Sequence, residues 1–235
     1  MLAHRRGDAP SRWLGRAAAP LRRQLWARDT FTEGSDTALT SHVADFPLKQ
    51  WVPIATQTQA QMGMVNAAND QLWLDMTNSN PRSALPVALP RHGNFTMRLT
   101  VPAFNITVEA RGVFLECYQG PAVGLGNNDQ NRRWNITFGW QNYLTDQYGG
   151  PSIGIGGDAL TTAWAGDSCT FVLDVRQGRY LTGRVYDSSG ALVFWRIGQH
   201  YPATMWWPGL QLQNQGVIPA NVVKLDNFEV WEGRQ

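Results

Sequence analysis

Alternating apolar and polar residues, broken at short intervals by turn residues, recur along most of this chain. The clearest run places four apolar residues on one face of an extended strand: Phe95, Met97, Leu99 and Val101. The same period of two returns in residues 104–108, 113–117 and 134–138. Each segment is typical of a half-buried strand in an antiparallel sheet. No long helical pattern interrupts them, so the chain is predicted to be all-β.

Further strands are predicted at 59–65, 71–76, 159–164, 170–176, 179–187 and 191–197. Gln177-Gly178 and Ser188-Ser189-Gly190 separate the last three and are good hairpin turns. Residues 78–90 contain three prolines, and residues 201–208 contain two, so both are predicted to be loops. About twelve to fourteen strands is the number expected of two stacked sheets.

The two ends of the strand-rich region resemble each other. A short strand is predicted at 29–32, and its Asp-Thr-Phe is echoed by Asp-Asn-Phe in a closing strand at 222–232. Such strands can pair inside one sheet, as a closed sandwich or jelly roll requires.

The opening segment also carries a longer motif. Between residues 29 and 52 the order is Asp-x-Phe, acidic-Gly-x-Asp-Thr-x-Leu-Thr-Ser-His, Asp-Phe and Trp-Val. This order resembles the start of a concanavalin A-like lectin/glucanase (LamG-like) jelly-roll domain as found in bacteriophage virion and tail proteins. Residues 225–230 are similar to the last strand of such domains. The resemblance covers 29–232, although only its two ends are motif-like, and it implies a two-sheet antiparallel jelly roll.

Residues 1–28 differ from the rest in composition and are predicted to form a basic, partly helical N-terminal arm, followed by the sandwich domain at 29–235. They hold seven Arg and one Asp, whereas the remaining chain holds 13 basic and 17 acidic residues. Partner contacts are assigned to the arginines and the large apolar residues of this arm: Arg5, Arg6, Arg12, Trp13, Leu14, Arg16, Arg22, Arg23, Leu25 and Trp26. Three roles stay open, namely docking in an assembly, packing on the chain's own body, and targeting.

Catalytic and metal sites are not predicted. Glucanases of this family carry clustered carboxylates on one strand face, as a retaining mechanism requires. The nearest set here is Asp226, Glu229 and Glu232, whose spacing of three should alternate between faces. The four histidines show no metal-ligand spacing. Cys117 and Cys169 are expected to be buried thiols, with a disulfide as the alternative.

Glycan binding is the better-supported site hypothesis. Lectin-like sandwiches stack an aromatic side chain on a sugar ring and bind its hydroxyls with polar side chains. Two segments have that composition, and their candidate residues are Asn127, Asn128, Asp129, Arg132, Tyr143 and Tyr148 in one, and Trp206 and Trp207 in the other. The competing interpretation is that these residues fill the sandwich and its turns.

From the resemblance, we expect a non-catalytic structural protein of a bacteriophage particle, a minor tail or capsid-surface component. Its arm would bind other virion proteins in a homo- or hetero-oligomeric assembly formed in the host cytoplasm. The alternative is a carbohydrate-binding module or adhesin for host surface glycans, and the third hypothesis is a diverged glycoside hydrolase. No cofactor, membrane or nucleic-acid partner is expected, because no apolar run is long enough to span a bilayer and the body is mildly acidic.

Overall fold

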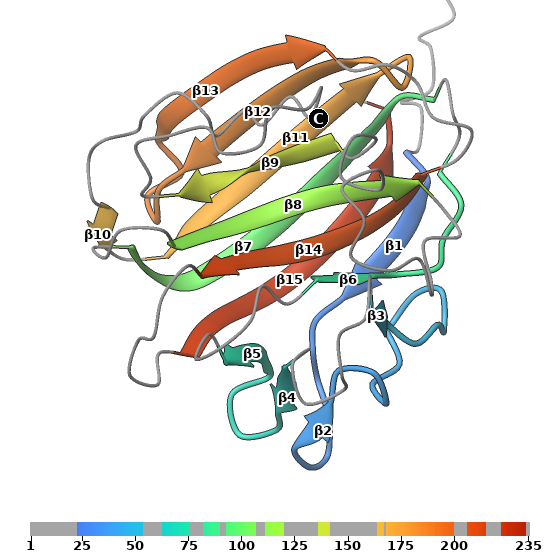
Figure 1. Cartoon of the computed structure of the whole chain (residues 1–235), viewed down its shortest axis with the longest axis vertical. Coiled ribbons are helices and arrows are strands. Elements are labelled where there is room, and N and C mark those ends of the chain that lie inside the picture. The colour runs from blue at the N-terminus through green and yellow to red at the C-terminus, as the bar shows by residue number, and fades with distance from the viewer. Residues whose placement is uncertain are drawn as a thin grey trace, which may run out of the picture.

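The computed structural model of the chain describes residues 23–53, 63–75, 82–89, 93–106, 111–119, 136–141, 164–166, 168–199, 206–214 and 222–233. All regular elements in these ranges are β-strands, and every pair between them is antiparallel (Figure 1). The predicted all-β fold is therefore confirmed for the part of the chain that is described. No helix in that part is long and apolar enough to cross a bilayer.

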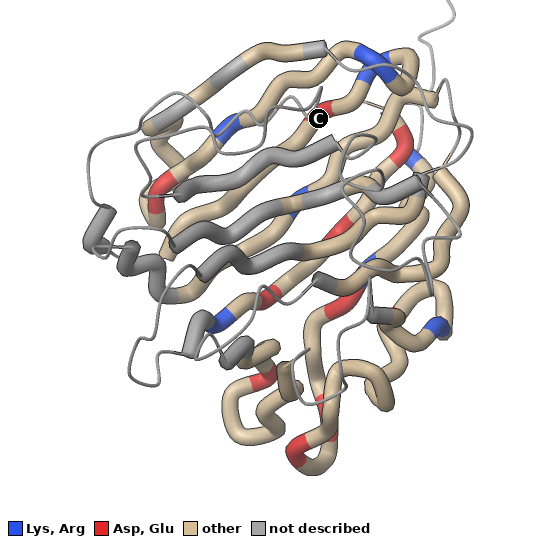
Figure 2. The backbone as a smooth tube through the Cα atoms, viewed as in Figure 1, with Lys and Arg blue, Asp and Glu red and all other residues tan. Residues whose placement is uncertain are grey.

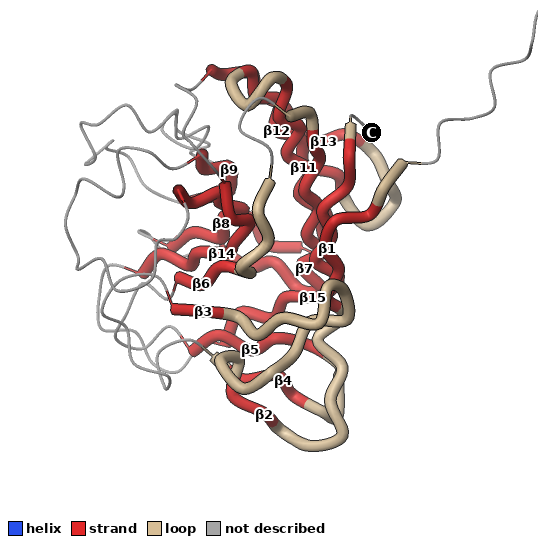
Figure 3. Tube along the Cα trace, turned by 90° about the vertical axis from the view of Figure 1, so that its right-hand side faces the viewer, coloured by secondary structure: helices blue, strands red, loops and turns tan. Residues whose placement is uncertain are grey.

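The strands form two sheets that lie face to face as separate layers (Figure 3). The ten-stranded sheet contains β1 (Leu25–Asp29), β2 (Thr37–Ala38), β4 (Met64–Asn66), β5 (Gln71–Asp75), β7 (Phe95–Ile106), β10 (Trp164–Gly166), β11 (Cys169–Arg176), β12 (Tyr180–Tyr186), β13 (Leu192–Gln199) and β15 (Val222–Glu232). The five-stranded sheet contains β3 (Val52–Pro53), β6 (Arg82–Ala84), β8 (Arg111–Gln119), β9 (Ile136–Gln141) and β14 (Trp206–Asn214).

The first and the last strand of the described chain lie side by side in the ten-stranded sheet. The larger sheet runs β13-β12-β11-β7-β15-β5-β4-β2, with β1 beside β15 and β10 beside β7. β1 pairs with β15 so that Asp29 lies opposite Phe228. The predicted pairing of the opening and closing strands in one sheet is confirmed. The smaller sheet runs β3-β6-β14-β8-β9.

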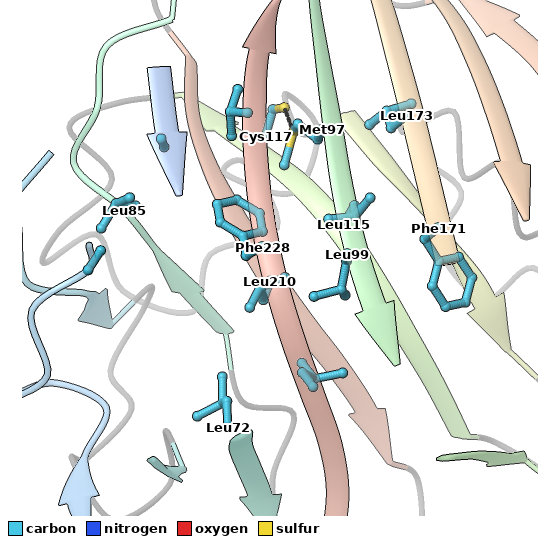
Figure 4. Packing of buried hydrophobic residues seen from close by; sticks show 14 of the residues in the cluster. Leu72, Leu85, Met97, Leu99, Leu115, Cys117, Phe171, Leu173, Leu210 and Phe228 are labelled. Atoms are coloured by element: carbon cyan, nitrogen blue, oxygen red, sulfur yellow. Dashed lines mark hydrogen bonds between the residues drawn. The ribbon is translucent and has the colours of Figure 1, made fainter. Parts of the chain in front are cut away.

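The core lies between the sheets and consists of the apolar side of the predicted alternation. Met97 and Leu99 of β7 and Leu115 and Cys117 of β8 are fully buried where the layers meet (Figure 4). The Cys117 thiol lies 3.1 Å from the sulfur of Met97. Burial of each large apolar side chain stabilises the fold by about 1.5–3 kcal/mol, so this interface is the main source of stability.

Both cysteines are buried thiols, as predicted, and no disulfide joins them. Cys117 belongs to the five-stranded sheet and Cys169 to the ten-stranded sheet. Burial raises the pKa of Cys169 to about 12, so this thiol stays protonated at physiological pH.

Both proline-rich segments were predicted to be loops, and both contain strand. β6 occupies residues 82–84, between Pro81 and Pro86, so no proline interrupts its pairing. β14 begins at Trp206 and includes Pro208, whose carbonyl accepts a hydrogen bond from the amide of Leu85 at 2.9 Å. Proline lacks only the backbone donor, so it can still contribute an acceptor to a sheet.

The predicted boundary between arm and body, at residues 28 and 29, falls inside β1. Leu25 lies opposite Trp231, and the ring of Trp26 lies 6.4 Å from that of Phe95 while packing on the core. The assignment of Leu25 and Trp26 to a partner-binding arm is therefore wrong, because an apolar strand beside β15 holds them on the chain's own sandwich. Arg23 is exposed, and the other predicted arm residues lie outside the described residues.

Candidate functional site

A buried polar cluster lies within the opening motif, and a second one, on the ten-stranded sheet, joins Thr96 and Asp174 with Arg184. Asp29 is completely buried at the end of β1. Its Oδ2 accepts a hydrogen bond from the indole Nε1 of Trp51 at 2.6 Å, and its Oδ1 accepts one from the amide of Phe31 at 2.8 Å. Nε2 of His42 lies 2.8 Å from Oδ1 of the same carboxylate. Three groups from three parts of the segment thus converge on Asp29.

Local backbone geometry brings this cluster together. The hydrogen bond from Phe31 to Asp29 turns the chain sharply after β1, and Phe31 adopts a φ of 51°. A bulky residue rarely takes a positive φ, so the surrounding contacts must hold it there. Phe31 is itself buried, with its ring 6.0 Å from Trp51. The polar and aromatic contacts therefore fix the same turn.

His42 lies between two carboxylates. Its Nδ1 is 2.6 Å from Oε1 of Glu33, on the side of the ring opposite Asp29. Burial alone would lower the pKa of His42, but the hydrogen bonds and negative charges of Asp29 and Glu33 outweigh burial and raise that pKa. A protonated ring donates one N–H hydrogen bond to each carboxylate, so the cluster has one cation between two anions.

This arrangement fixes the local structure of the opening segment. Both ring nitrogens of His42 are engaged, and its side chain is 1 % exposed. Within the described ranges no group of three or more His, Cys, Asp or Glu side chains is arranged to hold a metal ion. The hydrogen bonds of this cluster hold the segment after β1 against the sandwich. Sequence reasoning noted Asp29, Glu33, His42 and Trp51 as motif residues but missed that they contact one another.

The acidic residues of β15 correct a second expectation. Asp226 lies opposite Thr100, and Glu229 lies opposite Arg98, two residues along the same face of β7. A bulge between them, where Asn227 has a φ of 47°, brings both carboxyl groups to one face despite their spacing of three. The prediction that they alternate between faces is wrong for this pair.

The environments of these two carboxyl groups differ. Burial and the nearby charge of Asp70 raise the pKa of Asp226, although hydrogen bonds from Asn227 oppose the shift. Glu229 accepts a hydrogen bond from Nε1 of Trp231 at 3.1 Å and lies 4.0 Å from Nε of Arg28. Charges elsewhere on the described strands are sparse and mixed in sign (Figure 2).

Trp207 is the predicted glycan-binding residue whose side chain is described, and it faces away from the core. Leu210, three residues along β14, is buried between the sheets, so strand alternation puts Trp207 on the outward face. There it packs with Val52 against Ala84, in a cluster separate from the main core. Its neighbour on β8 is Tyr118. This half-buried indole is therefore part of an outer sheet surface.

Topology brings two of the predicted segments to one end of the five-stranded sheet. Trp206 lies opposite Gln119, the last residue of β8, and Ile136, the first residue of β9, lies opposite Cys117. The chain therefore leaves β8 beside Trp206 and returns at Ile136 on the other side of β8, which lies between β14 and β9. β9 ends at Gln141, opposite Gly112, so the segment with Tyr143 and Tyr148 begins at the other end of the sheet.

The other predicted glycan-binding residues lie outside the described residues: Asn127, Asn128, Asp129, Arg132, Tyr143 and Tyr148. Trp206 is placed in β14, although its side chain is not described. Their participation in a site stays a prediction.

The chain resembles known proteins in structure but not in sequence. No family model matches the chain, and no curated protein matches its sequence. Solved structures do match. Arcelin-5, a lectin-like defence protein from Phaseolus vulgaris, gives a TM-score of 0.53 at 10 % identity, over 85 % of this chain and 97 % of that one. Lectin II from Ulex europaeus gives 0.51 at 10 % identity, over 80 % of this chain and 94 % of that one.

A third match is the exoplasmic/lumenal domain of VIP36 in its Ca²⁺/Man2-bound form. Its TM-score is 0.50 at 10 % identity, over 83 % of this chain and 86 % of that one. The chain has a concanavalin A-like lectin fold. At this level of identity the likeness establishes the fold alone, which agrees with the fold implied by the opening and closing motifs. In this lectin fold the buried cluster at Asp29 holds the start of the domain, and Trp207 lies on the outside.

Proposed function

We propose that this chain is a non-catalytic carbohydrate-binding domain that recognises glycans with the β8–β14 end of its five-stranded sheet. The observation that carries the proposal is the pairing of Trp206 with Gln119. This pairing puts the Trp206-Trp207 dipeptide at the sheet end from which the segment 120–135 departs. The outward-facing indole of Trp207 and a segment rich in Asn, Asp and Arg are the two components that sugar recognition requires.

The physical case rests on the chemistry of sugar rings. The C–H groups of one face of a pyranose pack on an aromatic ring, and its hydroxyls require polar partners in fixed directions. Trp207 is half-buried against Ala84 and Val52, so its indole is held in place before a ligand arrives. A pre-ordered aromatic surface loses little entropy on binding, which favours recognition of weakly binding ligands such as sugars.

The fold comparison supports this function over the other hypotheses. Of the matched proteins, one is a lectin, one is a lectin-like defence protein, and the VIP36 domain is in a Ca²⁺/Man2-bound form. The diverged-hydrolase hypothesis draws on Asp226 and Glu229, which share a face. Glu229, however, is engaged by Trp231 and Arg28, and the pair lies on the ten-stranded sheet rather than beside Trp207.

We further propose that this carbohydrate-binding domain is a component of a bacteriophage particle. It rests on the resemblance of the opening and closing segments to virion domains, and it is compatible with glycan binding, as in a tail component that adsorbs to host glycans. Immunogold labelling of purified particles against this chain tests it. Labelling at the tail or capsid surface supports the virion role, and its absence from particles that package DNA normally contradicts that role.

Binding to a printed glycan array, followed by titration calorimetry with the best ligand, tests the function. Galactose and mannose oligosaccharides are the first probes. We expect Trp207→Ala to weaken binding about tenfold or more, because stacking of one aromatic ring contributes on the order of 1 kcal/mol beyond area burial. Trp73→Ala is the matched control, since Trp73 is also half-buried but stacks with Lys224 on the ten-stranded sheet. Equal losses in both variants, or no array ligand for the wild type, would refute the assignment.

A further inference from the structure

The outward face of β13 carries two large apolar side chains that the sandwich does not bury. Trp195 is 58 % exposed and Ile197 is 70 % exposed. In the neighbouring strand β12, Val185 is buried between the sheets, so strand alternation puts Arg184 on the outward face. Trp195 lies opposite Arg184 and therefore shares that face, as does Ile197 two residues along. Adjacent apolar side chains left on an open sheet face are a candidate binding surface.

The strand beside β13 carries a strip of cations. Arg184 lies within β12, and Tyr180 lies at its start, about 13 Å away along the strand. Arg179, in the turn before β12, lies over the ring of Tyr180 at 5.5 Å from its centroid, and Arg176 of β11 lies opposite Tyr180. Basic residues are seen at this turn and within β12 in Figure 2. The cationic strip is thus one strand, or about 4.8 Å, from the apolar strip.

Positive charge dominates this part of the outward face. The described outward side chains of β11, β12 and β13, with the turn between β11 and β12, include three arginines and one acidic residue, Asp174. Asp174 is buried and accepts hydrogen bonds from the hydroxyl of Thr96 and from Nη2 of Arg184, so its charge is compensated within the sheet. Acidic residues lie further along the sheet on β15, where Glu229 is opposite Arg98 of β7 and bounds the cationic area.

Arg184 has donor capacity beyond its contact with Asp174. Its side chain is 18 % exposed, and its Nε has no hydrogen-bond partner among the described residues. A guanidinium carries five N–H groups, and the contact with Asp174 uses Nη2. The group is therefore oriented from below by a buried carboxylate and can still donate to a ligand that lies beside Trp195.

The two strips match a sugar chain whose rings carry negative groups. A pyranose ring has apolar C–H faces and polar edges, so its faces pack on apolar side chains while its edge groups meet hydrogen-bond donors. On a chain lying along β13, ring faces would cover Trp195 and Ile197, which are about 6.6 Å apart. Carboxylates on the ring edges would then face Arg184 and Arg179. Arginine suits this role because its planar fork donates two hydrogen bonds to one carboxylate.

Other macromolecules fit this surface less well. The core of a protein interface is depleted of charge, whereas the apolar strip here is one strand wide and has arginines directly beside it. A nucleic acid carries a phosphate at every nucleotide, and residues 29–235 hold 17 acidic and 13 basic residues, which would repel it beyond the short cationic strip. A short run of acidic sugars needs only the strip itself.

We propose that the outward face of β12 and β13 binds an acidic, uronate-bearing polysaccharide, with Trp195 stacked on a sugar ring and Arg184 and Arg179 contacting its carboxylates. This surface belongs to the ten-stranded sheet, whereas Trp207 lies on the outward face of the five-stranded sheet. The inference therefore does not rest on the function proposed for Trp207. Two surfaces on opposite faces of the sandwich would let one domain engage two parts of a heterogeneous glycan layer.

Titration calorimetry of the full chain with oligogalacturonates at low ionic strength tests the ligand class. We expect binding that weakens as salt is added, because the contacts with exposed arginines are screened. The methyl esters of the same oligosaccharides keep the rings but lose the charges, and they should bind at least about tenfold more weakly. Polyglutamate and single-stranded DNA keep negative charge without sugar rings, and they should be weaker by a similar factor.

Substitutions test the surface. Trp195→Ala should weaken oligogalacturonate binding about tenfold through the loss of stacking. Arg179→Glu should also weaken binding and reduce its dependence on salt. Lys49→Glu is the matched control, since it makes the same change of charge at an exposed cation in the segment between β2 and β3. Thermal unfolding should show that all three variants fold like the wild type, because the replaced side chains are exposed.

Several outcomes would overturn the inference: no binding by the wild type, equal affinity for the methyl esters, equal affinity for polyglutamate or DNA, or equal losses in Arg179→Glu and Lys49→Glu. Trp207→Ala separates the two surfaces. It should leave the affinity for oligogalacturonates unchanged, and a loss there would place the acidic ligand on the five-stranded sheet. That result would contradict the present inference without contradicting the function proposed for Trp207.

Discussion

Nε2 of His42 lies 2.8 Å from Oδ1 of Asp29, and both side chains are buried at the start of the sandwich. A buried carboxylate is costly unless hydrogen bonds and an opposite charge compensate for its lost hydration. Asp29 has both, because Trp51, Phe31 and His42 all contact it. The opening motif is therefore explained by a structural requirement.

Replacement of Asp29 by alanine should destabilise the domain by about 3–5 kcal/mol, because it leaves a buried imidazolium and a buried indole N–H without their acceptor. Asp45→Ala is the matched control. Asp45 accepts hydrogen bonds from the amide and the hydroxyl of Thr30 at 3.0 and 2.8 Å, but it is exposed. Its loss should cost about 1 kcal/mol or less. Urea unfolding measures both, and similar losses for the two variants would contradict the role assigned to Asp29.

The free energy of unfolding should fall as pH rises above about 6.5, the ordinary pKa of histidine. Because folding raises the pKa of His42, its contribution is complete below the unfolded pKa and is lost as pH rises through the folded pKa. Guanidinium unfolding from about pH 5.5 to about pH 9 measures the slope. Because folding raises the pKa of Cys169 to about 12 from an ordinary value of about 8.5, this thiol adds a loss of stability of the same sign above about pH 8.5, and the slope due to His42 is read below that pH.

His42→Gln is the control for this pH dependence. Glutamine keeps hydrogen-bonding capacity but cannot be protonated, so the variant should be less stable and should lose most of the slope between neutral and alkaline pH. A slope that persists unchanged in His42→Gln would show that another group causes it.

The β11–β12 turn offers a stabilising change. Gln177 and Gly178 both have positive φ, 53° and 61°, as a type I′ turn requires. Glutamine is a poor residue for that conformation, whereas asparagine tolerates it. Gln177→Asn should therefore stabilise the domain by about 0.5 kcal/mol, and Gln177→Val should destabilise it by about 1–2 kcal/mol. Thermal unfolding gives the order, and the reverse order would contradict the turn assignment.

Element positions were predicted well where a single face is buried. The closing strand is found at the predicted residues 222–232, and β11, β12 and β13 lie within one or two residues of their predictions. In β12 buried and half-buried residues alternate as the sequence predicts, whereas residues 171–175 of β11 are all buried. The first residues of β14 were predicted to be a loop, because a proline usually interrupts a strand. Pro208 is accommodated because its carbonyl accepts a hydrogen bond from the amide of Leu85.

The buried cluster could not be predicted as a cluster. Asp29 and His42 are thirteen residues apart in a segment with little regular structure, so no periodicity relates them. The side-by-side placement of Trp206 and the end of β8 was equally inaccessible, because it depends on strand order. Sequence patterns report which face of a strand is buried, whereas strand order results from the packing of the whole sandwich.

Oligosaccharides that bind the domain should remain intact after long incubation. Asp226 and Glu229 share a face, but Glu229 is bound by Trp231 and lies near Arg28, so its carboxylate is already engaged. Mass spectrometry of the recovered ligand measures cleavage. Hydrolysis that disappears in Glu229→Gln would favour the diverged-hydrolase hypothesis over a purely recognitional role.

Truncation at the N-terminus separates the arm from the sandwich. β1 begins at Leu25, and Trp26 packs on the core beside Phe95. Deletion of residues 1–22 should therefore leave the unfolding midpoint nearly unchanged. Deletion of residues 1–28 removes four of the five β1 residues, together with the indole of Trp26, and should cost at least about 3 kcal/mol or abolish soluble expression.

The pair of truncations also discriminates between the roles left open for the arm. If residues 1–22 pack on their own sandwich, the shorter deletion will lower the midpoint as the longer one does. If they dock on another virion protein, the shorter deletion will fold normally, bind glycans normally and fail to join the particle. Unchanged incorporation of a stable chain lacking residues 1–22 would exclude an assembly role for those residues.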